Sequence, residues 1–299
     1  MISSTIKLLL FIVNHPLNRK ARALSLWQFL RWQLGSALTG SRVLIDWVDE
    51  TKILVRKGEK GLTGNLYCGF MEFADMCFLL HYLRSTDDFF DIGANAGAYT
   101  LLASGVIGAR STSFEPLPNT FDRFLDQVNI NRILHLVKAE NKGVGDKAGV
   151  LEFTNADDCM NHVNTDPKNI DVTKVEVISL DESYQPTNST FVKIDVEGYE
   201  SFVLDGGKMF FANNNVDAII IETNGSGAKY GVEDAAIDAR IREFGFHPVA
   251  YEPSSRLIKV MATFNSKGNT IYIKNLEKAK RRCSEAEKVI VHTAHGIEI

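Results

Sequence analysis

Residues 89–100 read Phe-Phe-Asp-Ile-Gly-Ala-Asn-Ala-Gly-Ala-Tyr-Thr and carry the strongest structural signal in the chain. A short apolar run reaches Asp91, a glycine-rich turn follows from Gly93 to Gly97, and a helix-like pattern comes next. Glycines let a backbone approach a ligand closely, and the start of a helix offers unpaired N–H groups to a polar ligand. The stretch therefore predicts a strand, a binding loop and a helix of the kind that holds a nucleotide-like ligand.

The glycine spacing separates two classes of ligand. A dinucleotide site has Gly-x-Gly-x-x-Gly after its first strand, but here three residues stand between Gly93 and Gly97. Asp91 would repel the phosphates of a dinucleotide, whereas its carboxylate can accept a hydrogen bond from the ammonium group of S-adenosylmethionine. Glu115 ends the next apolar run, where a carboxylate can accept both ribose hydroxyls. We therefore expect S-adenosylmethionine to bind at Asp91, Gly93, Asn95, Gly97 and Glu115.

Three blocks of the sequence together resemble a known family. They are residues 90–100, the Phe-Glu-Pro at 114–116, and the Val-Lys-Ile-Asp-Val-Glu-Gly-Tyr-Glu at 192–200. Over roughly residues 70–275 the chain is similar to the FkbM family of S-adenosylmethionine-dependent methyltransferases. The resemblance implies a class I, Rossmann-like α/β fold with a mostly parallel seven-stranded sheet and helices on both faces. It also implies O-methylation of a hydroxyl, often on a sugar or a polyketide-like natural product.

Alternating apolar segments from residue 88 onward predict a parallel sheet wrapped by helices. The strand candidates are Phe89–Ile92, Thr112–Glu115, His135–Lys138, Phe191–Ile194 and Asp217–Glu222. Helices are predicted after Pro118, with Phe121, Phe124, Leu125 and Val128 on one face, and before Gly245, with Ile237, Ile241 and Phe244. We expect residues 88–275 to form the methyltransferase domain, with Thr270–Ile273 as the antiparallel edge strand that the family's fold implies.

The segments on either side of this domain carry weaker signals. Residues 1–87 predict an accessory region, with a helix that places Leu26, Phe29, Leu30 and Leu34 on one face and a hairpin of 43–47 and 53–56. Such a region can cover an active site or form a homodimer contact, and the sequence leaves both roles open. Residues 276–299 are expected to form a C-terminal tail that starts with a charged, helix-prone segment.

Acidic side chains after the fourth strand are the leading catalytic candidates. Methyl transfer needs an aligned acceptor hydroxyl and a group that takes its proton, so Asp195 and Glu197 are expected to serve as base and hydroxyl acceptor. The alternative is that Glu197 caps the following helix and Asp195 orients a turn. His162, in a polar loop, is a second candidate base. Two carboxylates without a clear third ligand make a Mg2+ site the weaker reading, so no metal is expected.

Other polar residues follow the strands at the same edge. Glu222 and Asn224 come at the end of the fifth strand and are expected to bind the acceptor, although Asn224 also fits ordinary turn chemistry. Asp146 follows Val144-Gly145 and can accept a hydrogen bond from an adenine amino group, or simply belong to a turn. Two other functions remain open: an NAD-dependent oxidoreductase, which the glycine spacing disfavours, and a non-catalytic binding protein with the same fold.

The composition of the chain limits the classes of partner that it can bind. The chain has 299 residues, 45% hydrophobic and 23% charged, with a formal net charge of −4, which argues against a nucleic-acid binder. Cys68, Cys77, Cys159 and Cys283 show no Cys-x-x-Cys spacing, so we expect reduced thiols in a cytoplasmic protein. The apolar run at 6–13 contains a lysine and is too short to span a bilayer; a packed or amphipathic helix is favoured over a peripheral membrane contact. The expected partner is a small hydroxylated acceptor.

Overall fold

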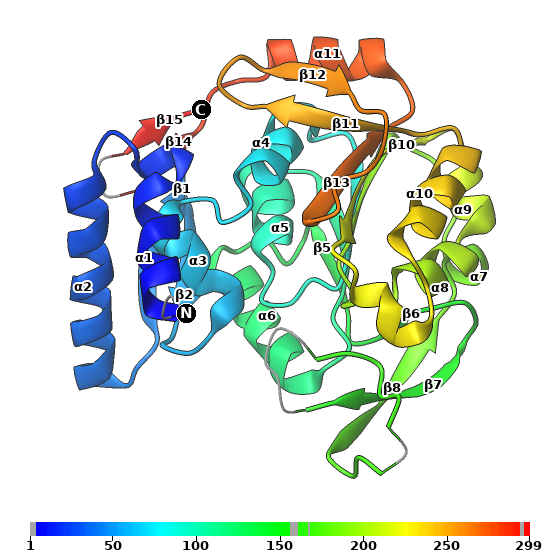
Figure 1. The fold of residues 1–299 in the computed structure, drawn as a ribbon, viewed down its shortest axis with the longest axis horizontal. Helices are drawn as coiled ribbons and strands as arrows, with labels where there is room; N and C mark the ends of the chain where they lie inside the picture. The colour runs from blue at the N-terminus through cyan, green and yellow to red at the C-terminus, as the bar shows by residue number, and fades with distance from the viewer. Residues whose placement is uncertain (1–3, 156–160, 167, 294–295) are drawn as a thin grey trace.

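The computed structural model describes residues 4–155, 161–166, 168–293 and 296–299, and an eight-stranded sheet forms its centre (Figure 1). The strand order is β12-β11-β13-β10-β9-β3-β4-β5. The bounds are β3 (Asp88–Ile92), β4 (Arg110–Phe114), β5 (Val137–Glu140), β9 (Thr190–Ile194), β10 (Val216–Thr223), β11 (His247–Glu252), β12 (Leu257–Val260) and β13 (Gly268–Ile273). The five strands from β10 to β5 are parallel, and the other three join antiparallel. The predicted α/β class and its mostly parallel sheet are confirmed.

The far side of the sheet differs from the prediction in two details. The strand predicted as the edge, β13, lies between β10 and β11, and the edge is an eighth strand, β12, paired with β11. The strand β12 was not predicted because an edge strand can be largely exposed and then has no apolar run in its sequence. Leu257, Lys259 and Val260 are indeed exposed. The expected count of seven is therefore one short in the described part of the chain.

Helices cover both faces of the sheet because its strands are apolar on both sides. Phe89 and Phe191 belong to one hydrophobic cluster, while their neighbours Phe90 and Val192 belong to another. The helices on the first face are α4 (Phe73–Tyr82), α5 (Ala98–Thr100) with η2 (Leu101–Val106), α6 (Pro118–Ile130) and α11 (Leu276–Glu285). Those on the second are α7 (Leu180–Ser183), α8 (Glu200–Asp205), α9 (Lys208–Ala212) and α10 (Asp234–Glu243).

A second sheet joins the two ends of the chain. The predicted hairpin is present as β1 (Val43–Val48) and β2 (Thr51–Val55), and β14 (Ile290–Val291) with β15 (Ile297–Glu298) extends it in the order β15-β14-β1-β2. Around it lie α1 (Ser4–Asn14), η1 (Pro16–Asn18), α2 (Arg22–Thr39) and α3 (Lys60–Cys68). Trp47 and Val291 share one hydrophobic cluster with Phe89. The division into 1–87, 88–275 and 276–299 stays a prediction, but a continuous core crosses both boundaries.

The structure contains a third, small sheet that the sequence did not predict. It consists of β6 (Gly143–Val144), β7 (Gly149–Thr154) and β8 (Val172–Ile178), in the order β6-β8-β7. Val163 forms a bridge to Phe153 in β7, and η4 (Ser226–Tyr230) reaches it through the Tyr230 hydroxyl, which donates to the Val163 carbonyl at 2.9 Å. Of the four cysteines, Cys68, Cys77 and Cys283 are free and buried, while Cys159 lies outside the described residues.

Candidate active site

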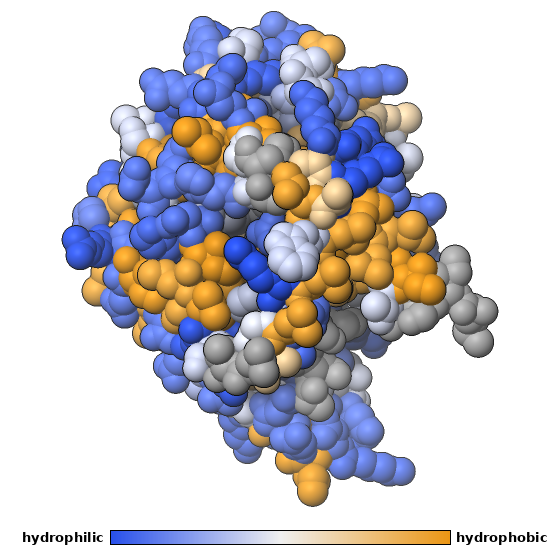
Figure 2. Space-filling view, turned by 90° about the vertical axis from the view of Figure 1, so that its left-hand side faces the viewer, coloured by the Kyte–Doolittle hydropathy of each residue, from blue (hydrophilic) through white to orange (hydrophobic). Residues whose placement is uncertain are grey.

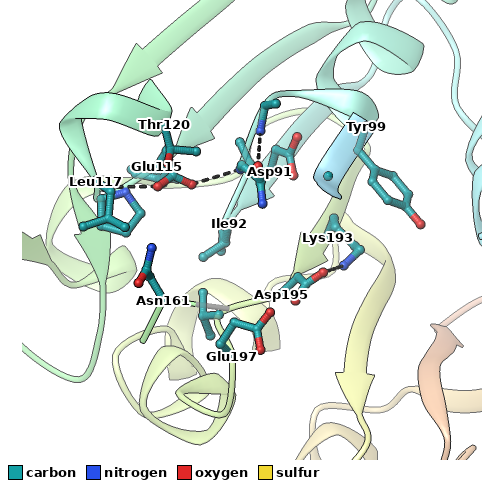
Figure 3. A pocket seen from close by; sticks show the side chains of 18 of the residues that line it. Asp91, Ile92, Tyr99, Glu115, Leu117, Thr120, Asn161, Lys193, Asp195 and Glu197 are labelled. Atoms are coloured by element: carbon teal, nitrogen blue, oxygen red, sulfur yellow. Dashed lines mark hydrogen bonds and ion pairs between the residues drawn. The ribbon is translucent and has the colours of Figure 1, made fainter. Parts of the chain in front are cut away.

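A cavity of about 350 Å³ lies at the carboxyl ends of β3, β4 and β9 (Figure 3). The chain order of the strands reverses at β3, which is where open α/β sheets bind their ligands. Four of the six predicted cofactor residues line it: Asp91, Gly93, Asn95 and Glu115. Gly97 and Asp146 are not part of its wall.

The loop from Gly93 to Gly97 packs closely on neighbouring residues on one side and borders the cavity on the other. Gly93 has φ +84°, and a Cβ there would stand 1.8 Å from the backbone oxygen of Asp195. Gly97 has φ +88°, and a Cβ there would meet the Phe124 ring at 2.6 Å. These two glycines therefore serve close packing of the loop on β9 and α6, and only Gly93 also borders the cavity.

Glu115 is fixed at the end of β4 by two backbone groups. One carboxylate oxygen accepts the N–H of Asn95 and the other accepts the N–H of Leu117, each at 3.0 Å. Burial raises the pKa of this carboxyl to about 7. Each oxygen has a second lone pair and the side chain lines the cavity, so the group can also accept hydroxyl donors of a ligand.

Asp91 is the buried acid at the end of β3. Its carboxylate accepts the Thr100 hydroxyl at 2.6 Å, and that hydroxyl also lies 2.7 Å from the Ser113 hydroxyl. Burial raises the pKa of Asp91 to about 6. A bound cation would favour its charged form, because the side chain lines the cavity.

A lysine that the sequence analysis left without a role lies in the wall. Lys193, the last but one residue of β9, is only 1% exposed, and its ammonium donates to the Asp195 carboxylate at 2.9 Å. Burial opposes its charge, but Asp195 and Glu72 outweigh burial and hold the pKa of Lys193 above its ordinary value. A lysine inside an apolar strand, as in Val-Lys-Ile-Asp, was the signal available in the sequence.

Asp195 and Glu197 both line the cavity, on the side opposite Glu115 (Figure 3). Burial, followed by the charge of Asp195, raises the pKa of Glu197 to about 7. The alternative of a helix cap does not apply to Glu197: α8 begins at Glu200, whose own carboxylate accepts the N–H groups of Val196 and Gly198. Glu197 is therefore left to face the cavity.

Glu222 joins these two acids from β10. One carboxylate oxygen from each of Asp195, Glu197 and Glu222 lies within 4.8 Å of the others. Burial and the charge of Asp195 raise the pKa of Glu222 to about 8. Glu222 is the third oxygen donor that the sequence analysis lacked, so the set has the chemistry to hold a divalent cation. The expectation that no metal is needed stays a prediction.

The remaining predicted residues lie away from the wall of the cavity. His162 stands between Asn161 and Val163, which do line it, and its backbone pairs with Thr154 of β7. Asn224 is exposed, and its side-chain oxygen accepts the N–H of Ser226 at 2.9 Å, which is the turn chemistry of the alternative reading. Asp146 is exposed after β6.

The region before residue 88 contributes to the wall. Gly61, Asn65, Met71, Glu72 and Met76 all border the cavity. Glu72 accepts the Tyr99 hydroxyl at 2.6 Å and the Asn269 amide at 2.9 Å, so it ties α4 to α5 and β13. Of the two roles that the sequence left open for this region, these contacts support that of covering the active site.

The charges of the wall favour a cationic ligand. Five carboxylates line the cavity, from Glu72, Asp91, Glu115, Asp195 and Glu197, against two ammonium groups, from Lys142 and Lys193. Lys142 is already paired with Glu176 at 2.9 Å and Lys193 with Asp195. Phosphates would be repelled here, and a sulfonium or ammonium group would be attracted.

The sequence model of the methyltransferase FkbM domain matches residues 91–248, more than half of the chain. The chain belongs to the FkbM methyltransferase family. The match begins at Asp91 and ends within β11, so it contains every catalytic and cofactor candidate named above.

The chain is also similar to individual proteins and to solved structures. The hexuronic acid methyltransferase AglP of Haloferax volcanii is 30% identical over 146 residues, which are 48% of this chain and 59% of AglP, so the match spans less than two thirds of that protein. Among solved structures, a precorrin-6y C5,15-methyltransferase from Geobacter metallireducens has a TM-score of 0.36 at 12% identity, covering 67% of this chain and 85% of that one. TrmK of M. capricolum, with S-adenosyl-homocysteine, has a TM-score of 0.37 at 9% identity, covering 67% and 68%.

Proposed function

We propose that this FkbM methyltransferase transfers a methyl group from S-adenosylmethionine to a hydroxyl of a sugar or another small hydroxylated acceptor. The observation that carries the choice of donor is the excess of carboxylates in the wall of the cavity. When bound, S-adenosylmethionine supplies an electrophilic methyl group on a cationic sulfur. The same charges disfavour the alternative of a dinucleotide-dependent oxidoreductase.

The residues divide between two ends of the cavity. Asp91 and the Gly93–Asn95 backbone would hold the ammonium end of the donor, and Glu115 would accept its ribose hydroxyls. Gly97 supports the loop from below. Asp146, exposed after β6, is the candidate partner of the adenine amino group. Apart from Gly97 and Asp146, the residues named in these roles all line the cavity.

Proton removal falls to the acids on the opposite side. Aliphatic hydroxyls are weak acids, so the proton must leave as the oxygen attacks, and the accepting group must already be aligned. Asp195 is held by Lys193, which fixes its orientation, and Glu197 stands next to it with a pKa of about 7, near the pH at which a base works best. Glu222 would bind the acceptor, because one of its carboxylate oxygens lies within 4.8 Å of those of Asp195 and Glu197. His162 and Asn224 are weaker candidates because they neither line the cavity nor join this set.

A sugar acceptor is supported by AglP, which is named as a hexuronic acid methyltransferase. The test is transfer of a labelled methyl group from S-adenosylmethionine to hexoses, hexuronic acids and their glycosides, with and without a chelator. We expect label in a base-stable methyl ether, unchanged by the chelator. Label on amines and on no hydroxylated compound would contradict O-methylation. Loss of activity with the chelator, restored by Mg2+, would assign the three-carboxylate set to a metal.

A further inference from the structure

The helices α1 and α2 expose apolar side chains that the fold does not need. In the described part of the chain, eight of the 18 exposed large hydrophobic residues lie on these two helices: Ile6, Leu8, Leu10, Phe11, Leu24, Trp27, Leu30 and Leu34. We call this set the N-terminal apolar face. Both helices lie at one side of the molecule, and Figure 2 shows large apolar areas on that side. A patch of this kind marks an interaction site in a soluble protein.

The helix α2 is apolar on two opposite sides. Phe29 and Trp32 point inward and are buried, whereas Trp27, Leu30 and Leu34 are 61%, 50% and 65% exposed. At 100° per residue the spacing 27, 30, 34 places these three on one stripe, and Leu24 continues it. The predicted helix is confirmed, but its predicted face is split: Phe29 packs into the core and Leu30 and Leu34 face outward.

Charge indicates what this face contacts. The first 45 residues contain six Lys or Arg and no Asp or Glu, so every acidic residue of a chain with net charge −4 lies after them. Five of the six, at positions 7, 19, 20, 22 and 31, are exposed, and within the described residues none of the five forms an ion pair. Lys7 lies on α1, Arg22 and Arg31 lie on α2, and the other two lie at the turn between the helices.

We propose that the N-terminal apolar face docks on an anionic membrane surface. Apolar side chains with a tryptophan on one side and basic residues around them are the composition of helices that lie in the lipid headgroup region. A two-fold dimer through the same face is disfavoured, because it would bring these unpaired cations against their own copies. Among the described helices none is long and apolar enough to cross a bilayer, so the contact is peripheral.

The test uses the full chain and vesicles of phosphatidylcholine with about one third phosphatidylglycerol, compared with phosphatidylcholine alone. We expect the protein to sediment with the anionic vesicles at low salt and much less with neutral ones. The triple variant Trp27→Gln, Leu30→Gln, Leu34→Gln should lower the bound fraction about tenfold or more. A matched triple variant at other exposed apolar positions, Val150→Gln, Met209→Gln and Leu257→Gln, should bind as the natural chain does. Equal melting temperatures of the two variants serve as the folding control.

Tryptophan emission gives an independent readout, since Trp32 and Trp47 are 8% and 1% exposed while Trp27 is 61% exposed. Anionic vesicles should shift the emission to the blue, and Trp27→Phe should abolish the shift while sedimentation persists. The proposal is overturned if the natural chain ignores anionic vesicles, or if the outward triple variant binds as well as the control. It is also overturned if the natural chain dimerises without vesicles and the outward triple variant alone does not. Methyl transfer to a soluble acceptor is unaffected by these outcomes, so the proposed function is tested separately.

Discussion

A buried lysine in β9 and an acid just after this strand form an ion pair in the wall of the cavity. Asp195 follows the last residue of β9 and lies two positions after Lys193, and the hydrogen bond between them holds the carboxylate at the wall of the cavity. The contact with Lys193 holds the Asp195 carboxylate in one orientation, which is what a base needs before it meets a hydroxyl.

We expect Asp195→Asn to retain S-adenosylmethionine binding and to lose turnover by roughly 10²- to 10⁴-fold, because the amide keeps the size of the side chain but cannot take a proton. His162→Ala should stay near the natural rate, since His162 is outside the wall of the cavity. Steady-state rates per folded molecule decide the matter. Normal turnover of Asp195→Asn, together with an inactive His162→Ala, would make His162 the base.

A second residue-scale expectation concerns pH and stability. Glu200 is 1% exposed, and burial raises its pKa from 4.5 to about 7, so the folded state holds its proton more tightly than the unfolded chain. The stability from this group is therefore complete below pH 4.5 and is lost as pH rises through about 7.

Glu200→Gln keeps an oxygen for the N–H groups of Val196 and Gly198 and removes the charge. At pH 8 we expect it to raise the free energy of unfolding by up to about 3 kcal/mol, and at pH 5 to change it little. Glu277→Gln, on the exposed surface, is the control and should melt as the natural chain does at both pH values. Equal melting curves of Glu200→Gln and the natural chain at pH 8 would show that the carboxyl is not strained by burial.

At the scale of elements, the loop between β3 and α5 depends on how closely it approaches β9. Gly93 and Gly108 both have positive φ, +84° and +78°. They differ in surroundings: a Cβ at Gly93 would stand 1.8 Å from the Asp195 carbonyl oxygen, whereas at Gly108 the nearest atom would be the Cβ of Ser85 at 3.8 Å. The pair separates the cost of the backbone conformation from that of the contact.

Gly108→Ala should cost roughly 1–2 kcal/mol of stability, which is the price of positive φ for a residue with a Cβ. Gly93→Ala should cost clearly more and should also abolish S-adenosylmethionine binding, because the loop must leave β9. Thermal melts with and without the donor measure both effects. If the two alanine variants melt alike, the close approach of the loop to β9 is wrong.

The elements that the sequence predicted best are buried strands and amphipathic helices. The five parallel strands, α6 and α10 were found within a few residues, because buried strands and amphipathic helices leave a period in the sequence. The strands β6, β7, β8, β11, β12, β14 and β15 were not predicted, because each is short or has exposed residues. Within the site, positions after strand ends were found by motif. The contributions of Glu72 and the α3 region were not predicted, because only folding brings residues 61–76 to the cavity. Lys193 was not assigned a role either, although its place in an apolar strand was a signal.

At the scale of the whole molecule, the two ends of the chain stabilise each other. Val48 in β1 pairs with Val291 in β14, and Val291 is fully buried in the cluster that also contains Phe89. The accessory region, the methyltransferase domain and the C-terminal strands should therefore unfold together.

Val291→Ala should lower the free energy of unfolding by about 2 kcal/mol and shift a single transition, because it removes buried methyl groups from the shared core. Ile290→Ala is the matched control: Ile290 is 47% exposed in the same strand, so its change should stay within about 0.5 kcal/mol. Two separate transitions, of which Val291→Ala moves only one, would show that the N-terminal part folds as an independent unit.

Calorimetric titration of S-adenosylmethionine measures whether the carboxylate-lined cavity binds the donor. We expect saturable binding to the natural chain and no binding of NAD. Glu115→Ala, shown to be folded by its melting curve, should bind about 5- to 150-fold more weakly, which corresponds to the 1–3 kcal/mol of a hydrogen bond to a charged group. Binding of NAD in place of S-adenosylmethionine, or an affinity unchanged in Glu115→Ala, would show that the cavity is not the donor site.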